Sequence, residues 1–221
     1  MPLPVLDAVR VLVLLFLATA ASAQITVGGD VSVGPSLTTL GASGTIEAAG
    51  IPVPIGTVEF PTSIGLDARA RLEVRGETWG GRVGVGYLSA SDIFDGAAIL
   101  GQTSVDIAFA LASGEVTVRQ PYGPGVLVAG VGPEVRVVLE EGSEREGLLG
   151  LLGDVRRSHL AVGASLGLEV ETGGVKLRPE VRGGLSLTPF SDDQIEVFGG
   201  NVQLGGDFRF NHVSASLTVG V

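Results

Sequence analysis

The chain has 221 residues with 24 acidic and 14 basic side chains, so its net charge is −10 and nucleic acid is not an expected partner. The absence of cysteine excludes disulfides and thiolate metal sites, and with only two histidines we expect no metal and no cofactor. The mean hydropathy is +0.45. Beyond the N-terminus no run reaches the roughly 18 consecutive apolar residues of a membrane helix, so helical membrane spans are excluded.

The N-terminus has the layout of an export signal. Arg10 precedes an apolar run over residues 11–18, and Ala-Ser-Ala at residues 21–23 stands before Gln24. This resembles a secretory signal peptide cleaved after residue 23. We therefore predict a signal peptide over residues 1–23 and one exported domain over residues 24–221. An uncleaved anchor is the minor alternative, because the apolar run is too short for a spanning helix.

The first half of the exported domain alternates apolar and polar residues, which predicts strands. The first predicted strand covers residues 25–33. Residues 35–61 are rich in glycine, proline and threonine, and their Ile-Pro-Val-Pro-Ile core argues against a ladder strand, so we predict a long loop. Strands over residues 64–75 and 79–89 follow, and Trp79 stands where an interfacial aromatic residue belongs.

The middle of the chain predicts two more strands. In the first, residues 102–111, we expect Phe109 and its apolar neighbours on the outward face and Asp106 on the inward face. Residues 112–125 are predicted as a somewhat long turn, and residues 126–139 as the next strand. A charged loop over residues 140–157 follows. Its carboxylate pair Glu140-Glu141 is predicted to be solvated, with a bridging hard cation as a weakly supported alternative.

The clearest pattern is a hairpin over residues 158–188. Leu and Val occupy one face of both runs, charged and small residues occupy the other, and Thr172-Gly173-Gly174 suits the turn. Pro179 lies inside the second run, where a closed barrel requires a bulge or a missing hydrogen bond. Residues 189–200, which include the pair Asp192-Asp193, are the last predicted loop. The final strand runs from about residue 201 or 204 to residue 221.

Eight strands result, joined alternately by long and shorter connections. Both runs of the hairpin exceed the roughly 9 to 11 residues that a tilted strand needs to cross a bilayer. We therefore predict an all-β fold: a closed, eight-stranded, antiparallel up-and-down transmembrane β-barrel with both termini on the periplasmic side. A secreted soluble β-sandwich or β-barrel is the alternative, because half-buried strands alternate in the same way.

One segment carries a family resemblance. Arg-Gln-Pro-Tyr at residues 119–122 followed by Val-Ala-Gly-Val-Gly at residues 128–132 is similar to the "RPY…aGvG" segment of small outer-membrane β-barrel proteins of the OmpA/OmpX-like class. The resemblance covers the exported domain. It implies a monomeric, porin-like barrel in the outer membrane of a Gram-negative cell, inserted by the barrel assembly machinery. Such a barrel contacts outer-membrane lipid and lipopolysaccharide. Family members usually end on an aromatic residue, whereas this chain ends on Val221.

Charged residues of both signs lie on the predicted inward faces, and inward glycines leave room for long side chains. We expect the charges to pair across the lumen and plug it, because an eight-stranded barrel is just wide enough to be filled by side chains. A narrow channel is the alternative. The predicted network comprises Asp67, Arg69, Arg71, Glu73, Arg75, Arg82, Asp106, Glu134, Arg136, Glu169, Glu171, Lys176, Arg178, Glu180 and Arg182.

Residues 208–214 resemble the F-x-H-x-S stretch of outer-membrane lipid A 3-O-deacylases. The resemblance implies His212 as base and Ser214 as nucleophile. However, Ala215 stands where that family has asparagine, and the alternation turns His212 and Ser214 inward, away from acyl chains. We therefore predict no enzymatic activity, with a structural or surface-interaction role through long outer loops whose ligand the sequence does not identify. The esterase remains an alternative.

Overall fold

The computed structural model describes residues 26–48, 51–59, 62–91, 106–142, 158–189, 194–197, 202–205 and 208–221. The predicted signal peptide over residues 1–23 lies outside the described residues. So do Asp192 and Asp193, and most of the predicted loop over residues 140–157. Within the described parts of the chain, no helix is long and apolar enough to cross a membrane.

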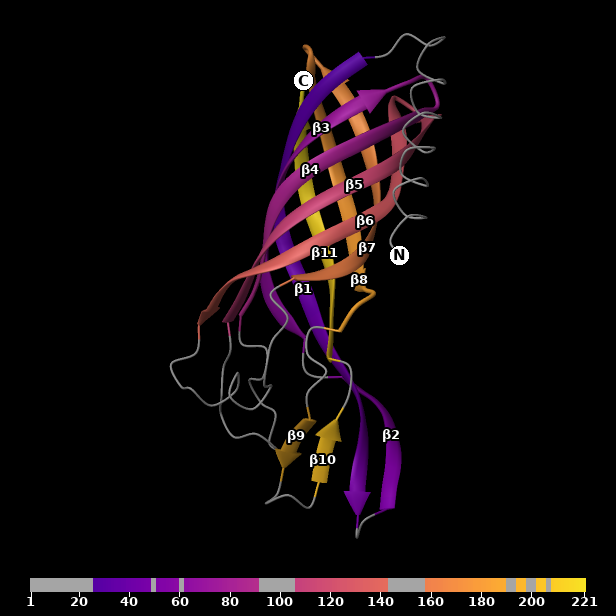
Figure 1. Ribbon diagram of the computed structural model, residues 1–221. Coiled ribbons are helices and arrows are strands. Elements are labelled where there is room, and N and C mark those ends of the chain that lie inside the picture. The colour runs from indigo at the N-terminus through magenta and orange to yellow at the C-terminus, as the bar shows by residue number, and fades with distance from the viewer. Residues whose placement is uncertain are drawn as a thin grey trace, which may run out of the picture.

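Eight antiparallel strands wind into a closed wall (Figure 1). Closure comes from β11, which pairs with its neighbour β8 and also with the first strand, β1. The predicted closed, eight-stranded, all-antiparallel β-barrel is therefore confirmed. The barrel strands are β1 (Thr26–Ala48), β3 (Ser63–Arg75), β4 (Trp79–Ala90), β5 (Asp106–Tyr122), β6 (Gly125–Gly142), β7 (Ser158–Thr172), β8 (Val175–Ser186) and β11 (Phe208–Gly220).

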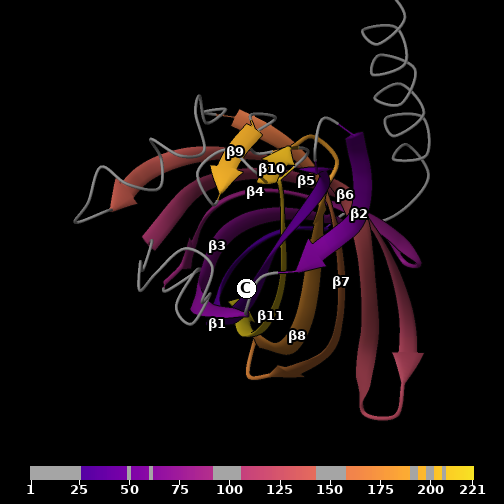
Figure 2. The same cartoon turned by 90° about the horizontal axis from the view of Figure 1, so that it is seen from below.

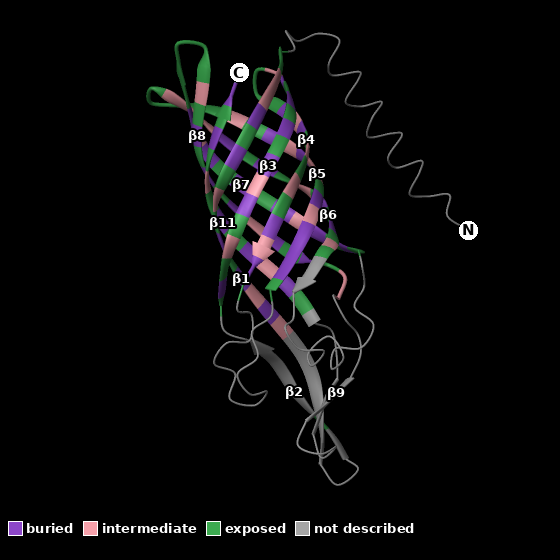
Figure 3. Ribbon diagram, turned by 90° about the vertical axis from the view of Figure 1, so that its left-hand side faces the viewer, coloured by how far each residue is buried: buried purple, intermediate pink, exposed green. Residues whose placement is uncertain are grey.

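Over most of the described barrel wall, side chains alternate between the lumen and the outer surface. Figure 3 shows this as alternating buried and exposed bands around the wall. The outward side chains of Val31 and Leu72 are 59% and 62% exposed, whereas the adjacent Asp30 and Arg71 are 5% and 3% exposed. The distribution is the reverse of a water-soluble core, because the enclosed side chains are largely polar and the exposed ones are apolar.

The predicted end of the first strand at residue 33 is wrong, as is the loop over residues 35–61. Strand β1 continues through Pro35 to Ala48 and pairs with β2 (Ile51–Glu59) in a hairpin beyond the barrel. Pro35 is tolerated because it stays in register with Leu66 on β3, while the ladder to β11 skips it. Pro52 and Pro54 lie in β2, the outermost strand of the described sheet, where a missing donor is acceptable.

The predicted turn over residues 112–125 is also wrong. Strand β5 runs to Tyr122, and the turn consists of Gly123 and Pro124, with Gly123 at a φ of 56°. The predicted facing of this strand is reversed as well, because Phe109 is 0% exposed and Asp106 is exposed. Phe109 lies on the same face of β5 as Glu115, which is also buried. The odd-numbered residues therefore face the lumen in both the apolar half and the charged half of the strand.

Pro179 is accommodated by missing pairing and not by a bulge. Strands β7 and β8 pair at Gly167 with Glu180 and again at Val170 with Leu177, so the register is unchanged across the gap. On its other side Pro179 remains opposite Leu217 of β11. The neighbouring ladder therefore holds β8 in place where the proline offers no N–H.

The two ends of the barrel differ. The short connections, including the turn at Gly173 and Gly174 with φ angles of 60° and 80°, lie at the end where β1 begins and the chain terminates (Figure 1). From the opposite end project the β1–β2 hairpin and a second hairpin of β9 (Gln194–Val197) and β10 (Val202–Gly205) (Figure 2). We call these the short-turn end and the long-connection end.

Candidate functional site

The lumen holds a dense charged network. Of the residues predicted for it, twelve lie inside the barrel with no more than 6% of their surface exposed. These are Asp67, Arg69, Arg71, Glu73, Arg75, Arg82, Glu134, Arg136, Glu169, Arg178, Glu180 and Arg182. Alternation along five strands, β3, β4, β6, β7 and β8, brings them to one enclosed face.

Three predicted residues do not belong to the buried network. Asp106 is exposed, because it lies on the opposite face of β5 from the buried Glu115. Glu171 is exposed and Lys176 is half-buried; they face each other across the short turn of the β7–β8 hairpin, at the mouth of the lumen. Glu171 lies on the same face of β7 as Glu169, and Lys176 on the same face of β8 as Arg178. The enclosed part of the lumen ends before it reaches these two residues.

Three charged residues of the network were missed. Asp30 alternates with the outward Val31 and Val27, so the sequence did contain a signal for it. Glu115 and Arg119 lie in the part of β5 that was predicted as a turn, so the alternation of this segment was not used to assign them to a face. Glu115 is 5% exposed, and Arg119 forms ion pairs with two lumen carboxylates.

Glu180 of β8 is the hub of the central layer. One of its carboxylate oxygens accepts from Arg71 Nη1 at 2.7 Å, and the other accepts from Arg82 Nη1 at 2.9 Å and Arg178 Nε at 3.1 Å. Arg71 lies on β3 and Arg82 on β4, so these bonds cross the lumen between strands that are not neighbours in the sheet. Charge-assisted hydrogen bonds of this kind are about twice as strong as neutral ones.

A second layer lies nearer the long-connection end and contains the two residues of the esterase alternative. Ser214 Oγ donates to Asp67 Oδ2 at 2.8 Å, and His212 Nδ1 is 2.9 Å from Arg136 Nη2. His212 is 3% exposed and Ser214 is 2% exposed. The serine hydroxyl is thus directed to a carboxylate and not to the imidazole, and both groups face the enclosed lumen.

An apolar layer closes the lumen at the long-connection end. Phe109 of β5 and Phe210 of β11 meet in an edge-to-face contact with ring centroids 4.8 Å apart, and Phe109 also meets the His159 ring at 5.2 Å. Leu40 and Leu88, also completely buried, complete this layer. The sequence did not indicate it, since Phe109 was assigned to the outer face and Leu40 to a loop.

Inward glycines make room for the guanidinium groups. A Cβ atom on Gly130 of β6 would lie 2.7 Å from both Arg82 Nη2 and Glu115 Oε2, and 2.8 Å from Ser165 Oγ. These separations are too short for real Cβ contacts, so a side chain at this position would displace the network. The glycine therefore determines how closely the charges approach the wall.

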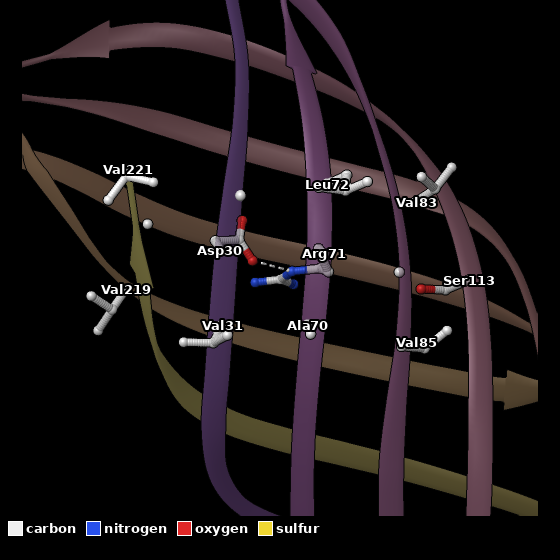
Figure 4. Close-up of a pocket in the computed structure, with 13 residues that line it drawn as sticks. Asp30, Val31, Ala70, Arg71, Leu72, Val83, Val85, Ser113, Val219 and Val221 are labelled. Carbon is white, nitrogen blue, oxygen red and sulfur yellow. Dashed lines mark hydrogen bonds and ion pairs between the residues drawn. The ribbon is translucent and has the colours of Figure 1, made fainter.

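A hollow of about 790 Å³ runs along β1, β3, β4, β5 and β11 (Figure 4). Its lining includes outward apolar side chains such as Val31, Leu72 and Val83, and also Asp30 and Arg71. Arg71 Nε donates to Asp30 Oδ1 at 2.6 Å, so the two charged lining residues are already paired with each other. Within the described residues no group of three or more histidine or acidic side chains is arranged to hold a metal ion.

Comparisons with known proteins give structural similarity alone. No family model matches the chain, and no curated protein matches it. Three solved structures are similar to it at low identity. The outer membrane protein OprG from Pseudomonas aeruginosa is 10% identical with a TM-score of 0.48, covering 87% of this chain and 96% of that one. Neisserial surface protein A is 13% identical with a TM-score of 0.42, covering 85% and 97%. Ail, the attachment invasion locus protein of Yersinia pestis, is 11% identical with a TM-score of 0.37, covering 88% and 98%.

Proposed function

We propose that this chain is an outer-membrane β-barrel protein of a Gram-negative cell, exported through a cleaved signal peptide. The observation that carries the proposal is the exposed apolar face of the closed barrel. Large hydrophobic side chains from every barrel strand are exposed, among them Val85 at 65%, Leu166 at 53% and Leu217 at 51%. Soluble monomers rarely expose a contiguous apolar surface on this scale, whereas a bilayer requires one.

Strand length and aromatic placement support the same proposal. The barrel strands contain 12 to 23 residues, enough for the roughly 9 to 11 residues of a tilted membrane crossing. Trp79 and Tyr122 are 62% and 66% exposed and lie next to short turns at one end of the barrel. Amphipathic rings at this level suit the membrane–water interface. Outer-membrane lipid, lipopolysaccharide and the barrel assembly machinery are accordingly the proposed partners of a monomer.

We further propose that the lumen is plugged. Arg71 and Arg82 reach across it to Glu180, so any continuous water path has to break several charge-assisted hydrogen bonds. The apolar layer around Phe109 and Phe210 adds a second barrier at the long-connection end. Because the interior is filled, we assign the function to the outer surface. The protein then has a structural or surface-interaction role and acts through its long connections and projecting hairpins.

The proposed role is non-enzymatic. A serine esterase needs a base within hydrogen-bond reach of its nucleophile and a path for the acyl substrate. Ser214 instead donates to Asp67 within the lumen, and His212 is held beside Arg136. The outward neighbours Val213 and Leu217 are the residues placed to meet lipid.

Membrane fractionation combined with a heat-modifiability gel tests the proposal. We expect recovery in the outer-membrane fraction, a shift in migration on boiling, and a mature N-terminus at residue 24 by mass spectrometry. In planar bilayers we expect no steady current steps. Recovery in the soluble fraction would overturn the membrane assignment, and regular conductance steps would overturn the plug while leaving the barrel intact.

A further inference from the structure

A polar pocket of about 370 Å³ opens at the short-turn mouth of the barrel. Its charged lining residues are three bases and two acids, so the bases exceed the acids by one: Arg75 of β3, Arg119 of β5, Glu169 and Glu171 of β7, and Lys176 of β8. The Gly123-Pro124 turn also lines it. The volume is many times the roughly 30 Å³ that one water molecule occupies in the liquid. The pocket is therefore large enough for a solute, and it opens at the short-turn edge of the charged network that fills the lumen.

Arg75, which lines this pocket, has an unused hydrogen-bond donor. Its Nε and Nη2 atoms both lie 2.8 Å from Glu73 Oε2, and the residue is only 6% exposed. The remaining nitrogen, Nη1, is buried and has no hydrogen-bond partner among the described residues. A buried guanidinium donor without an acceptor is costly, so the position favours a ligand that supplies one.

The charge balance also favours an anion. Arg119 donates to Glu73 at 3.3 Å and to Glu169 at 2.7 Å, and Arg178 donates to Glu169 at 3.1 Å. Over the described lumen, seven buried arginines plus Arg119 face seven buried carboxylates, so cations exceed anions by one. The carboxylates are Asp30, Asp67, Glu73, Glu115, Glu134, Glu169 and Glu180.

We propose that the short-turn mouth binds an oxyanion of the phosphate type, with Arg75 Nη1 as its buried donor and Lys176 at the rim. A guanidinium presents parallel N–H groups that match a phosphate, and the rim ammonium adds a mobile charge. This site goes beyond the proposed surface role, because it faces the side opposite the long connections. The oxyanion is a free solute or the headgroup of a lipid, and the two sources share this chemistry.

Calorimetric titration of the exported chain in detergent micelles, with inorganic phosphate in a phosphate-free buffer of low ionic strength, tests the site. We expect saturable binding that Arg75→Gln weakens about tenfold or more, the loss of a charge-assisted hydrogen bond. The matched variant Arg209→Gln, which removes an exposed arginine near the other end, should bind phosphate like the parent. Equal binding by Arg75→Gln would overturn the proposal.

A second measurement does not depend on the variant folding. In ¹⁵N-arginine spectra of the parent protein, phosphate should shift the Arg75 side-chain signal and leave the Arg69 signal in place. An unmoved Arg75 signal would overturn the proposal. In micelles of a phosphate-free detergent, a shift that requires free phosphate assigns the oxyanion to a solute, whereas a shift on adding phosphatidylglycerol alone assigns it to a headgroup.

Discussion

Arg69 Nη1 on β3 donates to Glu134 Oε2 on β6 at 2.6 Å, joining two strands that are separated by β4 and β5. Both side chains are almost fully enclosed, at 2% and 0% exposure. Arg136 Nε donates to the other oxygen of the same carboxylate at 2.8 Å. Glu134 thus holds two guanidinium groups and ties opposite walls of the barrel together.

Removing the Glu134 charge should therefore destabilise the barrel. Glu134→Gln leaves the buried charges of Arg69 and Arg136 without their shared counter-ion, a loss of about 3–5 kcal/mol in the free energy of unfolding. Urea unfolding in micelles, followed by the fluorescence of the single tryptophan Trp79, measures it. The control Glu171→Gln removes an exposed carboxylate and should change stability by about 0.5 kcal/mol or less. Equal effects of the two variants would contradict a cross-lumen role for Glu134.

A side chain at Gly130 should disturb the charged network. Gly130→Ala places a methyl group 2.7 Å from Arg82 Nη2, which is the end of a side chain and can shift, so we expect about 1 kcal/mol of destabilisation from overpacking. Gly114→Ala is the matched control, because a Cβ there meets nothing within 4 Å. Unfolding midpoints of the two variants in the same detergent decide the point. If Gly130→Ala lowered the unfolding midpoint less than Gly114→Ala does, the charged side chains around Gly130 would have to rearrange at little cost, which would contradict this prediction.

A charge on the outer face separates a membrane barrel from a soluble one. Val85 is 65% exposed in mid-strand, and Val85→Arg should cost about 2–4 kcal/mol if it faces hydrocarbon. The same change at the exposed Gln120, near a short turn, should cost about 0–1 kcal/mol because the interface is wet. Equilibrium refolding into lipid vesicles measures both. Near-zero cost at both positions would support the soluble alternative.

The apolar layer should contribute strongly to stability and little to conduction. Phe109→Ala removes a completely buried ring that contacts Phe210 and His159, at an expected cost of about 3–5 kcal/mol. Phe109→Leu keeps most of the volume and should cost less. Planar-bilayer recordings of Phe109→Ala should still show no steady current, because the Glu180 layer remains in place. Current steps in this variant alone would make the aromatic contact the principal barrier.

Ser214→Ala should leave lipid A unchanged. The hydroxyl donates to Asp67, so its removal should cost about 1.5–3 kcal/mol of stability, the contribution of a hydrogen bond to a charged group. Mass spectrometry of lipid A from cells that express the parent or the variant should show the same acyl chains. A serine-dependent loss of one chain would establish the esterase and overturn the non-enzymatic proposal.

The sequence by itself determined the wall of this barrel. Its period of two is a local property, so alternation at residues 158–188, with glycines at the turn, was enough to place the hairpin and to assign Glu169 and Arg178 to the lumen face. What each charge bonds to was beyond the sequence. The contact between Arg69 and Glu134 depends on the curvature that brings β3 and β6 face to face.

Tertiary structure also decided where local signals conflict. Phe109 belongs to an apolar run that favours the outer face. The same strand carries Glu115, whose ion pairs with Arg82 and Arg182 hold the odd-numbered face of β5, and Phe109 with it, toward the lumen. Pro35 is a local signal for the end of a strand. Strand β1 nevertheless continues, because Pro35 stays paired with Leu66 on β3 at the point where the pairing with β11 is interrupted. Which face of a strand points inward, and where the strand ends, therefore depend on partners that are distant in sequence. The alternation that builds the wall depends only on the local order of apolar and polar residues.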